Sequence, residues 1–283
     1  MATTSLKALL EEIGEVLGLI ESRTATGGST MSLVDTFYQS SRLPSTYLDN
    51  CWVRPTSGSD SGQERRVATF APASGTITPD RAWTTGPSNG TTYQVLRYFD
   101  WIDWKAALNR GLERCHYVDE EAVTIVANTR QYTMPTWVER ATDLVGLTVR
   151  HGTTVNDYDR VVLGDWEIYE DAGALYINAP QLSTADTLLV KGWRRYAVLS
   201  ADTDTTACPK ELAIAAGKIE AVQKIMNACA PQERRFWERA YEQASRDFTW
   251  ISRIYTRRVP RDITVGQPSE WVDPARTTWK DMT

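Results

Sequence analysis

The chain has 283 residues, of which 42% are hydrophobic and 24% are charged, and its formal net charge is −5. This length suits one large or two small globular domains. No run of about 18 apolar residues occurs, and acids interrupt the N-terminal apolar pattern, so the sequence predicts neither a membrane-spanning helix nor a secretion signal.

The N-terminal residues 1–46 are expected to form a helix and a joint. Apolar residues recur every three or four positions over residues 6–20, which predicts an amphipathic helix of about four turns. Gly14 and Gly18 weaken such a helix by up to ~1 kcal/mol each. The helix belongs either to the core or to a contact with a neighbouring subunit. Residues 24–32 (TATGGSTMS) predict a flexible joint.

Residues 47–98 consist of short β-prone runs separated by turn clusters such as SGSDSG and TTGPSNG. This pattern predicts a small antiparallel sheet inserted between helices. The glycines fit neither the phosphate loop G-x-x-x-x-G-K-[ST] nor the dinucleotide motif G-x-G-x-x-G, and turn chemistry explains them.

A helix and a strand-rich region follow. Asp100 is expected to cap a helix that starts at Trp101, because its carboxylate can accept the unpaired N–H groups of the first turn. Trp104 and Leu108 continue the apolar stripe of this helix. Over residues 122–195, extended runs are joined by short turns, which predicts an antiparallel sheet.

Residues 188–255 are the stretch around which the chain is organised. A strand ending in WRRY leads into the acidic loop SADTDTTA, and Pro209 opens a helix with an apolar stripe over residues 212–229. A second helix carries an apolar stripe over residues 237–255. Two long amphipathic helices joined by a tight break predict an antiparallel helical hairpin.

These elements predict an α+β fold. Its helical core would contain the N-terminal helix, the central helix and the C-terminal helical hairpin, with antiparallel β-rich insertions and an extended C-terminal arm. The expected parts are residues 1–46 (N-terminal helix and flexible joint), 47–98 (β-rich insertion), 99–262 (helical core with antiparallel sheet) and 263–283 (C-terminal arm).

The C-terminal arm has no amphipathic period but contains the large apolar residues Trp271, Val272 and Trp279. Two interpretations stay open. The arm packs back on its own domain, or it lies extended on a partner, as a linear peptide docks in a groove.

Positive charge gathers near the end of the second helix. Residues 209–262 hold 11 Lys/Arg against 7 Asp/Glu. The excess is greatest at the end of the helix, where Asp247 and Asp262 oppose five arginines: Arg246, Arg253, Arg257, Arg258 and Arg261. One interpretation is a solvated helix end stabilised by the helix dipole. The other is an electrostatic footprint for DNA or for an acidic partner.

The sequence predicts no catalytic, cofactor-binding or metal site. His116 and His151 have no Cys, Asp or Glu at metal-ligand spacing, although a triad assembled in space stays open. Asp202 and Asp204 form the best acidic cluster, and a loop that caps the next helix explains them more simply than a divalent cation does. The WRRY segment offers groups that stack on bases, but a strand edge with extended Arg side chains is the simpler interpretation.

The four cysteines are far apart in the chain: Cys51, Cys115, Cys208 and Cys229. Their spacing argues against a disulfide framework or a zinc site and predicts buried thiols in a reducing compartment. The 11 Trp and 12 Tyr residues favour a protein that interacts with others, because amphipathic rings are enriched at interfaces.

The order of parts around Cys208 resembles a known family. A strand with an Arg-rich aromatic end, an acidic loop, the run Cys208-Pro209-Lys210-Glu211-Leu212 opening an Ala-rich helix, and a charged second helix are similar to the head-to-tail connector (adaptor, neck) proteins of tailed bacteriophages. The resemblance covers residues 100–261 and rests on layout, not on a strict motif. The long β-rich run at residues 47–96 departs from the smaller members of that family.

The resemblance implies a structural virion protein that is not an enzyme and has no cofactor. It implies a homo-oligomeric ring, commonly a dodecamer, which docks on the portal protein and joins it to tail or nozzle proteins. Double-stranded DNA would pass through the ring without sequence-specific binding. The protein would be assembled in the host cytoplasm, lie in the virion neck or tail and contact no membrane. From the composition of the arm, we expect Trp271, Val272 and Trp279 to reach the portal.

Two alternative functions stay open. A virion carbohydrate- or host-surface-binding module would use exposed aromatic residues on the β-rich segments and would form a compact trimer. A hydrolase would need a pocket around His116 or His151.

Overall fold

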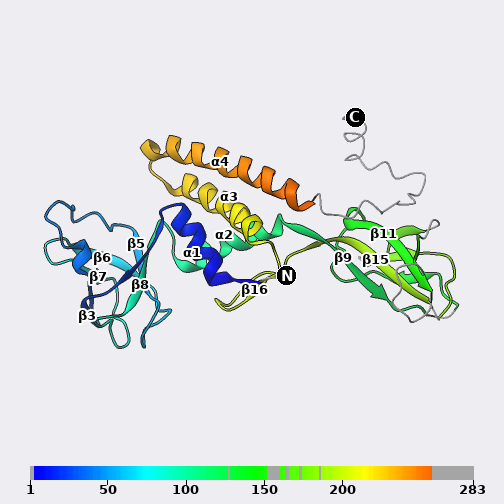
Figure 1. Ribbon diagram of the computed structural model, residues 1–283, viewed down its shortest axis with the longest axis horizontal. Helices are drawn as coiled ribbons and strands as arrows, with labels where there is room; N and C mark the ends of the chain where they lie inside the picture. Colours follow the sequence, from blue (N-terminus) through cyan, green and yellow to red (C-terminus); the bar gives the residue numbers. More distant parts are fainter. Residues whose placement is uncertain are drawn as a thin grey trace. The chain divides into compact units, whose positions relative to one another are not determined.

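The computed structural model describes residues 3–126, 128–151, 160–162, 166–171, 174–184 and 186–256 (Figure 1). The chain forms two compact units. The first contains the described residues up to Cys115 together with Tyr196–Tyr255, and the second contains those of His116–Arg195. The chain therefore leaves the first unit once and returns to it. In the described part of the chain, no helix has the length and apolar character needed to cross a membrane.

The first unit contains four α-helices in its described part: α1 (Leu6–Val16), α2 (Trp101–Glu113), α3 (Lys210–Ala228) and α4 (Pro231–Thr256). The predicted start of α2 is confirmed, because the Asp100 carboxylate accepts a hydrogen bond from the Asp103 N–H at 2.7 Å. Helix α1 is shorter than predicted. Gly18 adopts a φ of 68°, and its N–H bonds to the Glu15 carbonyl at 3.0 Å, so the helix ends in a glycine C-cap.

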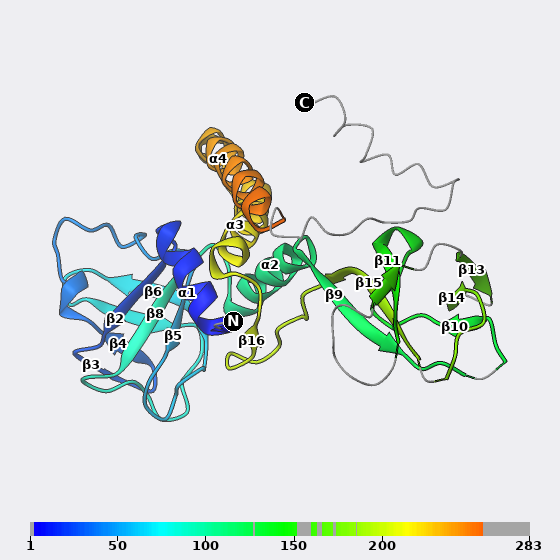
Figure 2. The same ribbon diagram turned by 45° about the vertical axis from the view of Figure 1, so that its right-hand side comes forward.

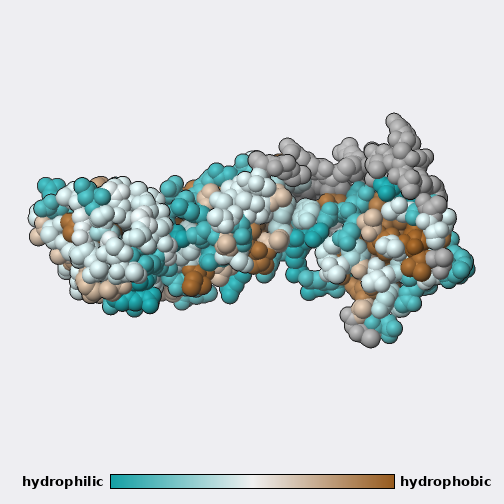
Figure 3. Space-filling view, turned by 90° about the horizontal axis from the view of Figure 1, so that it is seen from below, coloured by the Kyte–Doolittle hydropathy of each residue, from teal (hydrophilic) through white to brown (hydrophobic). Residues whose placement is uncertain are grey.

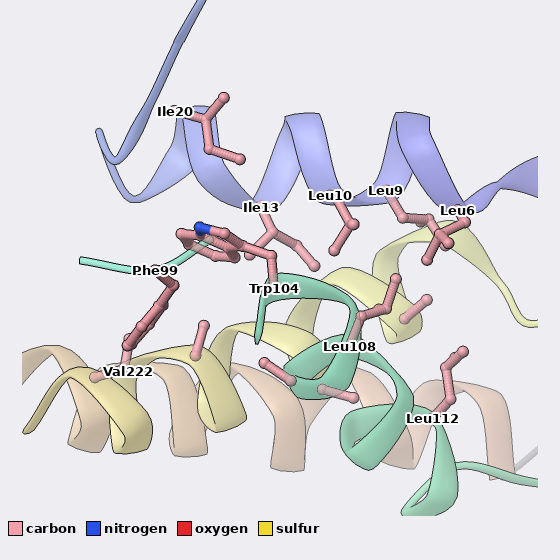
Figure 4. Packing of buried hydrophobic residues seen from close by; sticks show 14 of the residues in the cluster. Leu6, Leu9, Leu10, Ile13, Ile20, Phe99, Trp104, Leu108, Leu112 and Val222 are labelled. Carbon is pink, nitrogen blue, oxygen red and sulfur yellow. The ribbon is translucent and has the colours of Figure 1, made fainter. Parts of the chain in front are cut away.

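One hydrophobic cluster contains residues from all four helices. Figure 4 shows Leu10 and Ile13 of α1 pointing toward Trp104 of α2. Helices α2 and α3 approach so closely that a Cβ atom on Gly111 would lie 2.6 Å from the carbonyl carbon of Ala216. Small residues on these two helices therefore set their separation.

The first unit also holds a seven-stranded antiparallel sheet in the order β2-β8-β5-β6-β7-β4-β3 (Figure 2). Its strands are β2 (Ile20–Thr24), β3 (Gly27–Ser29), β4 (Ser32–Val34), β5 (Cys51–Pro55), β6 (Arg65–Ala71), β7 (Thr76–Pro79) and β8 (Thr92–Arg97). The two end strands, β2 and β3, are separated in the chain only by Ala25 and Thr26. The sheet consequently curls back on itself around a second buried cluster, which includes Leu33, Phe70 and Tyr93.

Three short elements complete the first unit. Strand β1 (Thr4–Ser5) pairs with β16 (Thr205–Thr206), and η1 (Thr36–Tyr38) is a single 3₁₀ turn. The β1–β16 pair ties the start of α1 to the loop that precedes α3.

The second unit consists mainly of two antiparallel sheets. One has the order β12-β11-β15-β9 and the other β10-β14-β13. Their strands are β9 (His116–Val123), β10 (Gln131–Thr133), β11 (Leu144–His151), β12 (Arg160–Val162), β13 (Glu167–Asp171), β14 (Ala174–Asn178) and β15 (Asp186–Arg195), and η2 spans Ala141–Asp143. A third hydrophobic cluster is buried here and includes Tyr132, Leu147, Ile177 and Val190.

The predicted fold class, an α+β protein with a helical core and a C-terminal hairpin, is wrong. The described chain is mostly antiparallel β-sheet, arranged in four sheets, and has only four α-helices. The prediction treated residues 47–98 as an insertion, whereas β2, β3 and β4 pair into the same sheet. Residues 24–32, predicted as a flexible joint, contain β3 and the start of β4. Strand pairing joins residues far apart in sequence, and local composition does not reveal it.

The division into compact units falls after Cys115 and Arg195. The sequence suggested no boundary at either place. The domain limits at residues 46, 98 and 262 stay predictions.

Candidate interaction surface on helix α4

Helix α4 is fixed to the first unit along one side. Trp237 is 5% exposed and meets the Tyr98 ring edge-on, with 5.8 Å between ring centroids. The Tyr98 hydroxyl donates to Glu233 at 3.0 Å, and the Tyr255 hydroxyl donates to Glu211 on α3 at 2.9 Å. Contacts at both ends therefore hold α4 beside α3 (Figure 1).

The hydrogen bond from Tyr255 also affects the pKa of Glu211. Its pKa is lowered, first by a hydrogen bond from its own backbone N–H and then by the Tyr255 hydroxyl. Both interactions favour the ionised carboxylate, so the hydrogen bond between the two helices is charge-assisted at neutral pH.

Another side of α4, beside the buried stripe, carries two large apolar side chains that the described residues leave largely exposed. Phe236 and Trp250 are each 67% exposed, and Ile254 is 39% exposed. Phe236 and Trp250 lie about four turns apart, so they share one side of the helix at a separation of ~21 Å. Exposed aromatic rings on a well-packed helix are typical of a surface that binds another protein.

A row of arginines runs beside these rings. Arg235, Arg239, Arg246 and Arg253 are exposed and recur at intervals of four and seven residues, which places them on one stripe. Arg246 forms an ion pair with Glu242 at 4.0 Å, but both side chains are highly exposed, so this pair contributes little to stability. Among the residues that the structure describes, Arg235, Arg239 and Arg253 have no ion-pair partner.

We call the set Arg235, Phe236, Arg239, Arg246, Trp250, Arg253 and Ile254 the α4 surface. The sequence contained a signal for it. Phe236 and Trp250 each stand one position before a residue of the buried stripe, Trp237 and Ile251, so they fall outside the apolar period. From this set, sequence reasoning singled out only Arg246 and Arg253.

The acidic loop before α3 has a structural role. Asp204 accepts hydrogen bonds from the N–H groups of Ala201 and Ser200 at 2.8 and 2.7 Å, which lower its pKa. Asp202 forms an ion pair with Arg54 of β5 and accepts a hydrogen bond from the Trp101 indole at 2.8 Å. In the described part of the chain, no group of three or more His, Cys, Asp or Glu is arranged to hold a metal ion.

A half-buried carboxyl lies beside this loop contact. Both Glu64 oxygens accept the backbone N–H of Trp101, at 2.9 and 3.1 Å. Burial raises the pKa of Glu64 to about 7, although the Trp101 hydrogen bond opposes the shift. The start of α2 therefore rests on a group that titrates near neutral pH.

The remaining candidates of the sequence analysis lie in strands. His116 opens β9 and His151 ends β11. In β15, Arg194 forms an ion pair with Asp119 at 2.8 Å, and Arg195 forms one with Glu139 at 3.4 Å. Both guanidinium groups are thus engaged by carboxylates of the same unit. The interpretation as a strand edge is not borne out, because β15 lies between β11 and β9 in its sheet.

Several predicted site residues lie outside the described residues. They are the three remaining arginines of the basic helix end, Arg257, Arg258 and Arg261, and the expected portal-docking residues Trp271, Val272 and Trp279.

The cysteines agree with the prediction of free thiols. Cys51, Cys115 and Cys208 are buried, Cys229 is partly buried, and none forms a disulfide. Burial raises the pKa of Cys51 to about 11, so this thiol stays protonated at neutral pH.

No protein-family model matches the chain, and none of the curated proteins is significantly similar to it.

Proposed function

We propose that this chain is a structural virion protein, the subunit of a ring-forming head-to-tail adaptor that docks on a portal, joins it to the tail and leaves a channel for DNA. The observation that carries the proposal is the α4 surface. It presents two exposed aromatic rings and a row of arginines on a helix that the rest of the unit holds in place.

The position of this surface in the chain supports the proposal. Strand β15, the acidic loop, α3 and α4 follow one another in the order on which the resemblance to phage adaptors rests. Helix α3 is buried along much of its length, and its buried residues include Ala213, Ala216 and Ala221. An internal helix of small residues lets α4 lie close to the unit while its other side stays available to a partner.

The proposal includes the partners that the resemblance implies. Neighbouring copies would close into a ring, commonly a dodecamer, and the portal and tail or nozzle proteins would bind on either side of it. Duplex DNA would cross the ring without sequence-specific contacts, because a net negative chain does not attract the phosphate backbone. The ring would form in the host cytoplasm and stay in the virion neck.

Electron microscopy of the purified chain tests the proposal, alone and mixed with the portal protein encoded beside it. We expect rings on the portal that are lost with Phe236→Ser and Trp250→Ser. Val126→Ser is the matched control, since Val126 is 59% exposed but lies in the second unit.

Two outcomes would contradict the proposal. A small oligomer that does not bind the portal would contradict the adaptor function and favour a carbohydrate- or host-surface-binding module. Rings that form equally well with Phe236→Ser and Trp250→Ser would show that the α4 surface does not carry the assembly. Truncation after Arg261 tests the expected docking arm separately, because rings that survive it would exclude a role for the arm.

A further inference from the structure

The second unit presents an outward face that complements the α4 surface. In the β10-β14-β13 sheet, Ile168 and Ile177 pair with each other on the core side. Every residue of the end strand β13 except Ile168 is exposed, and the alternate residues Glu167, Tyr169 and Asp171 lie on the face away from Ile168. Hydrophobic residues also reach the surface of the second unit in other places, as the brown patches of Figure 3 show.

The centre of this face is aromatic and its flanks are acidic. The Tyr169 and Tyr176 rings stack with their centroids 5.5 Å apart and an interplanar angle of 21°. Glu167 and Asp171 stand on either side of Tyr169 along β13, at a separation of ~13 Å. We call Glu167, Tyr169, Asp171 and Tyr176 the β13 face.

The α4 surface repeats this arrangement with the opposite charge. Arg246 and Arg253 stand on either side of Trp250, and seven helical residues span ~10 Å. The reach of two Arg side chains covers the difference between the two spacings. An Arg–Trp–Arg row can therefore meet a Glu–Tyr–Asp row, with the indole against the tyrosine pair and each guanidinium against a carboxylate.

The charge balance of the two parts favours this partner over nucleic acid. Helix α4 interleaves five arginines with four acids, so it lacks the excess of positive charge that phosphate binding needs. Residues 116–195 hold 12 Asp/Glu against 7 Lys/Arg, which makes the second unit an acidic body. A mixed-charge, aromatic helix suits a protein surface of complementary charge.

We propose that the α4 surface of one copy docks on the β13 face of a second copy of this chain. The two halves of such an interface differ, so a bound pair of copies keeps one free α4 surface and one free β13 face. Head-to-tail contacts of this type close into rings or extend into filaments. This interface rests on the proposed ring, because it names the contact between neighbouring subunits. Association of two copies through it does not require the portal.

Charge reversal with exchange tests the interface. Variant A carries Arg246→Glu and Arg253→Glu, variant B carries Glu167→Arg and Asp171→Arg, and variant AB carries all four changes. The control carries Arg42→Glu and Arg81→Glu, two exposed arginines of the first unit, and has the same net charge as variant A. Sedimentation velocity measures self-association at chain concentrations up to about 1 mM, the weak end of specific binding.

We expect the wild type and the control to self-associate, and we expect A and B each to associate at least ~100-fold more weakly, because like charges then face each other. Variant AB should recover to within ~10-fold of the wild type, since the charges are again opposite. An equimolar mixture of A and B should also recover. A contact within one copy could not be restored by mixing, so this result separates the two cases.

Several outcomes would overturn the inference. They are a wild type that is monomeric throughout, a variant A that associates as the wild type does, or a variant AB that fails while it remains folded by circular dichroism. DNA binding by the wild type that is lost in variant A, with self-association unchanged, would assign the α4 surface to nucleic acid.

The adaptor function and the proposed interface can each be contradicted while the other is kept. Rings on the portal that variant A also forms would keep the adaptor and exclude this interface. Self-association that variant AB restores, without any ring on the portal, would keep the interface and exclude the adaptor.

Discussion

The close approach of α2 and α3 makes Gly111→Ala a sharp test of the packing beneath α4. An added Cβ at Gly111 would lie 2.6 Å from the carbonyl carbon of Ala216, 2.7 Å from the N of Gly217 and 2.8 Å from the carbonyl oxygen of Ala216. All three atoms belong to the backbone of α3. No rotamer change can relieve these contacts, so the two helices must separate.

Two opposing effects set the size of the change. Alanine favours a helix interior over glycine by up to ~1 kcal/mol. Overpacking against an immobile backbone costs ~1–3 kcal/mol and opens space elsewhere in the helical cluster. We therefore expect Gly111→Ala to lower the free energy of unfolding by roughly 1–2 kcal/mol.

Gly217→Ala is the matched control, because the same propensity gain applies in α3. Its Cβ would lie 2.6 Å from Cδ1 of Ile13 and 3.1 Å from Cδ1 of Leu108, both at the ends of flexible side chains. These side chains can rotate away, so we expect Gly217→Ala to be at least ~1 kcal/mol less destabilising than Gly111→Ala.

Urea unfolding followed by far-ultraviolet circular dichroism measures both variants, because the helices dominate this signal in the first unit. A Gly111→Ala protein as stable as the wild type would refute the packing argument. So would a Gly217→Ala protein that is the less stable of the two.

Three further changes test the polar contacts of the first unit, each by urea or thermal unfolding. Arg54 is 6% exposed, pairs with Asp202 and stacks on the Trp101 ring. We therefore expect Arg54→Ala to lower the free energy of unfolding by ~2–4 kcal/mol, and a decrease below about 1 kcal/mol would contradict a structural role for the pair. Asp60 is 2% exposed and accepts hydrogen bonds from the backbone N–H groups of Thr85 and Gly86 at 3.0 and 2.7 Å. We therefore expect Asp60→Ala to lower the free energy of unfolding by ~1–3 kcal/mol and Asp60→Asn to lower it less. The pKa of Glu64 is raised to about 7, so the folded chain holds this proton more tightly than the unfolded chain, and stability should fall as pH rises from about 4.5 to 7 and stay level above it. Glu64→Gln should remove this dependence of stability on pH. It should also raise the free energy of unfolding at pH 8 by ~1–2 kcal/mol, after allowance for solvent screening of a partly exposed group. An unchanged pH dependence would count against the raised pKa.

Local chemistry determined the ends of the helices. The start of α2 depends on a cap three residues away, between Asp100 and Asp103, and a sequence displays such a contact directly. The end of α1 depends on Gly18, whose positive φ terminates the helix. The sequence showed this glycine as a weak point, but the apolar period beyond it, through Ile20, predicted a longer helix. Ile20 is buried because it belongs to β2, which strand pairing alone decides.

The tertiary structure decided the fold class and the candidate surface. Ile20 pairs with Leu96, and Thr24 pairs with Thr92, although these partners stand far apart in the sequence, and no local pattern encodes such pairing. Contacts between distant parts of the chain also decide which residues of α4 are exposed. The sequence contained Phe236 and Trp250 as apolar residues outside the buried period, but their exposure depends on which helices cover the other side of α4. Propensity and capping act over a few residues, whereas burial is set by residues that only the folded chain brings together.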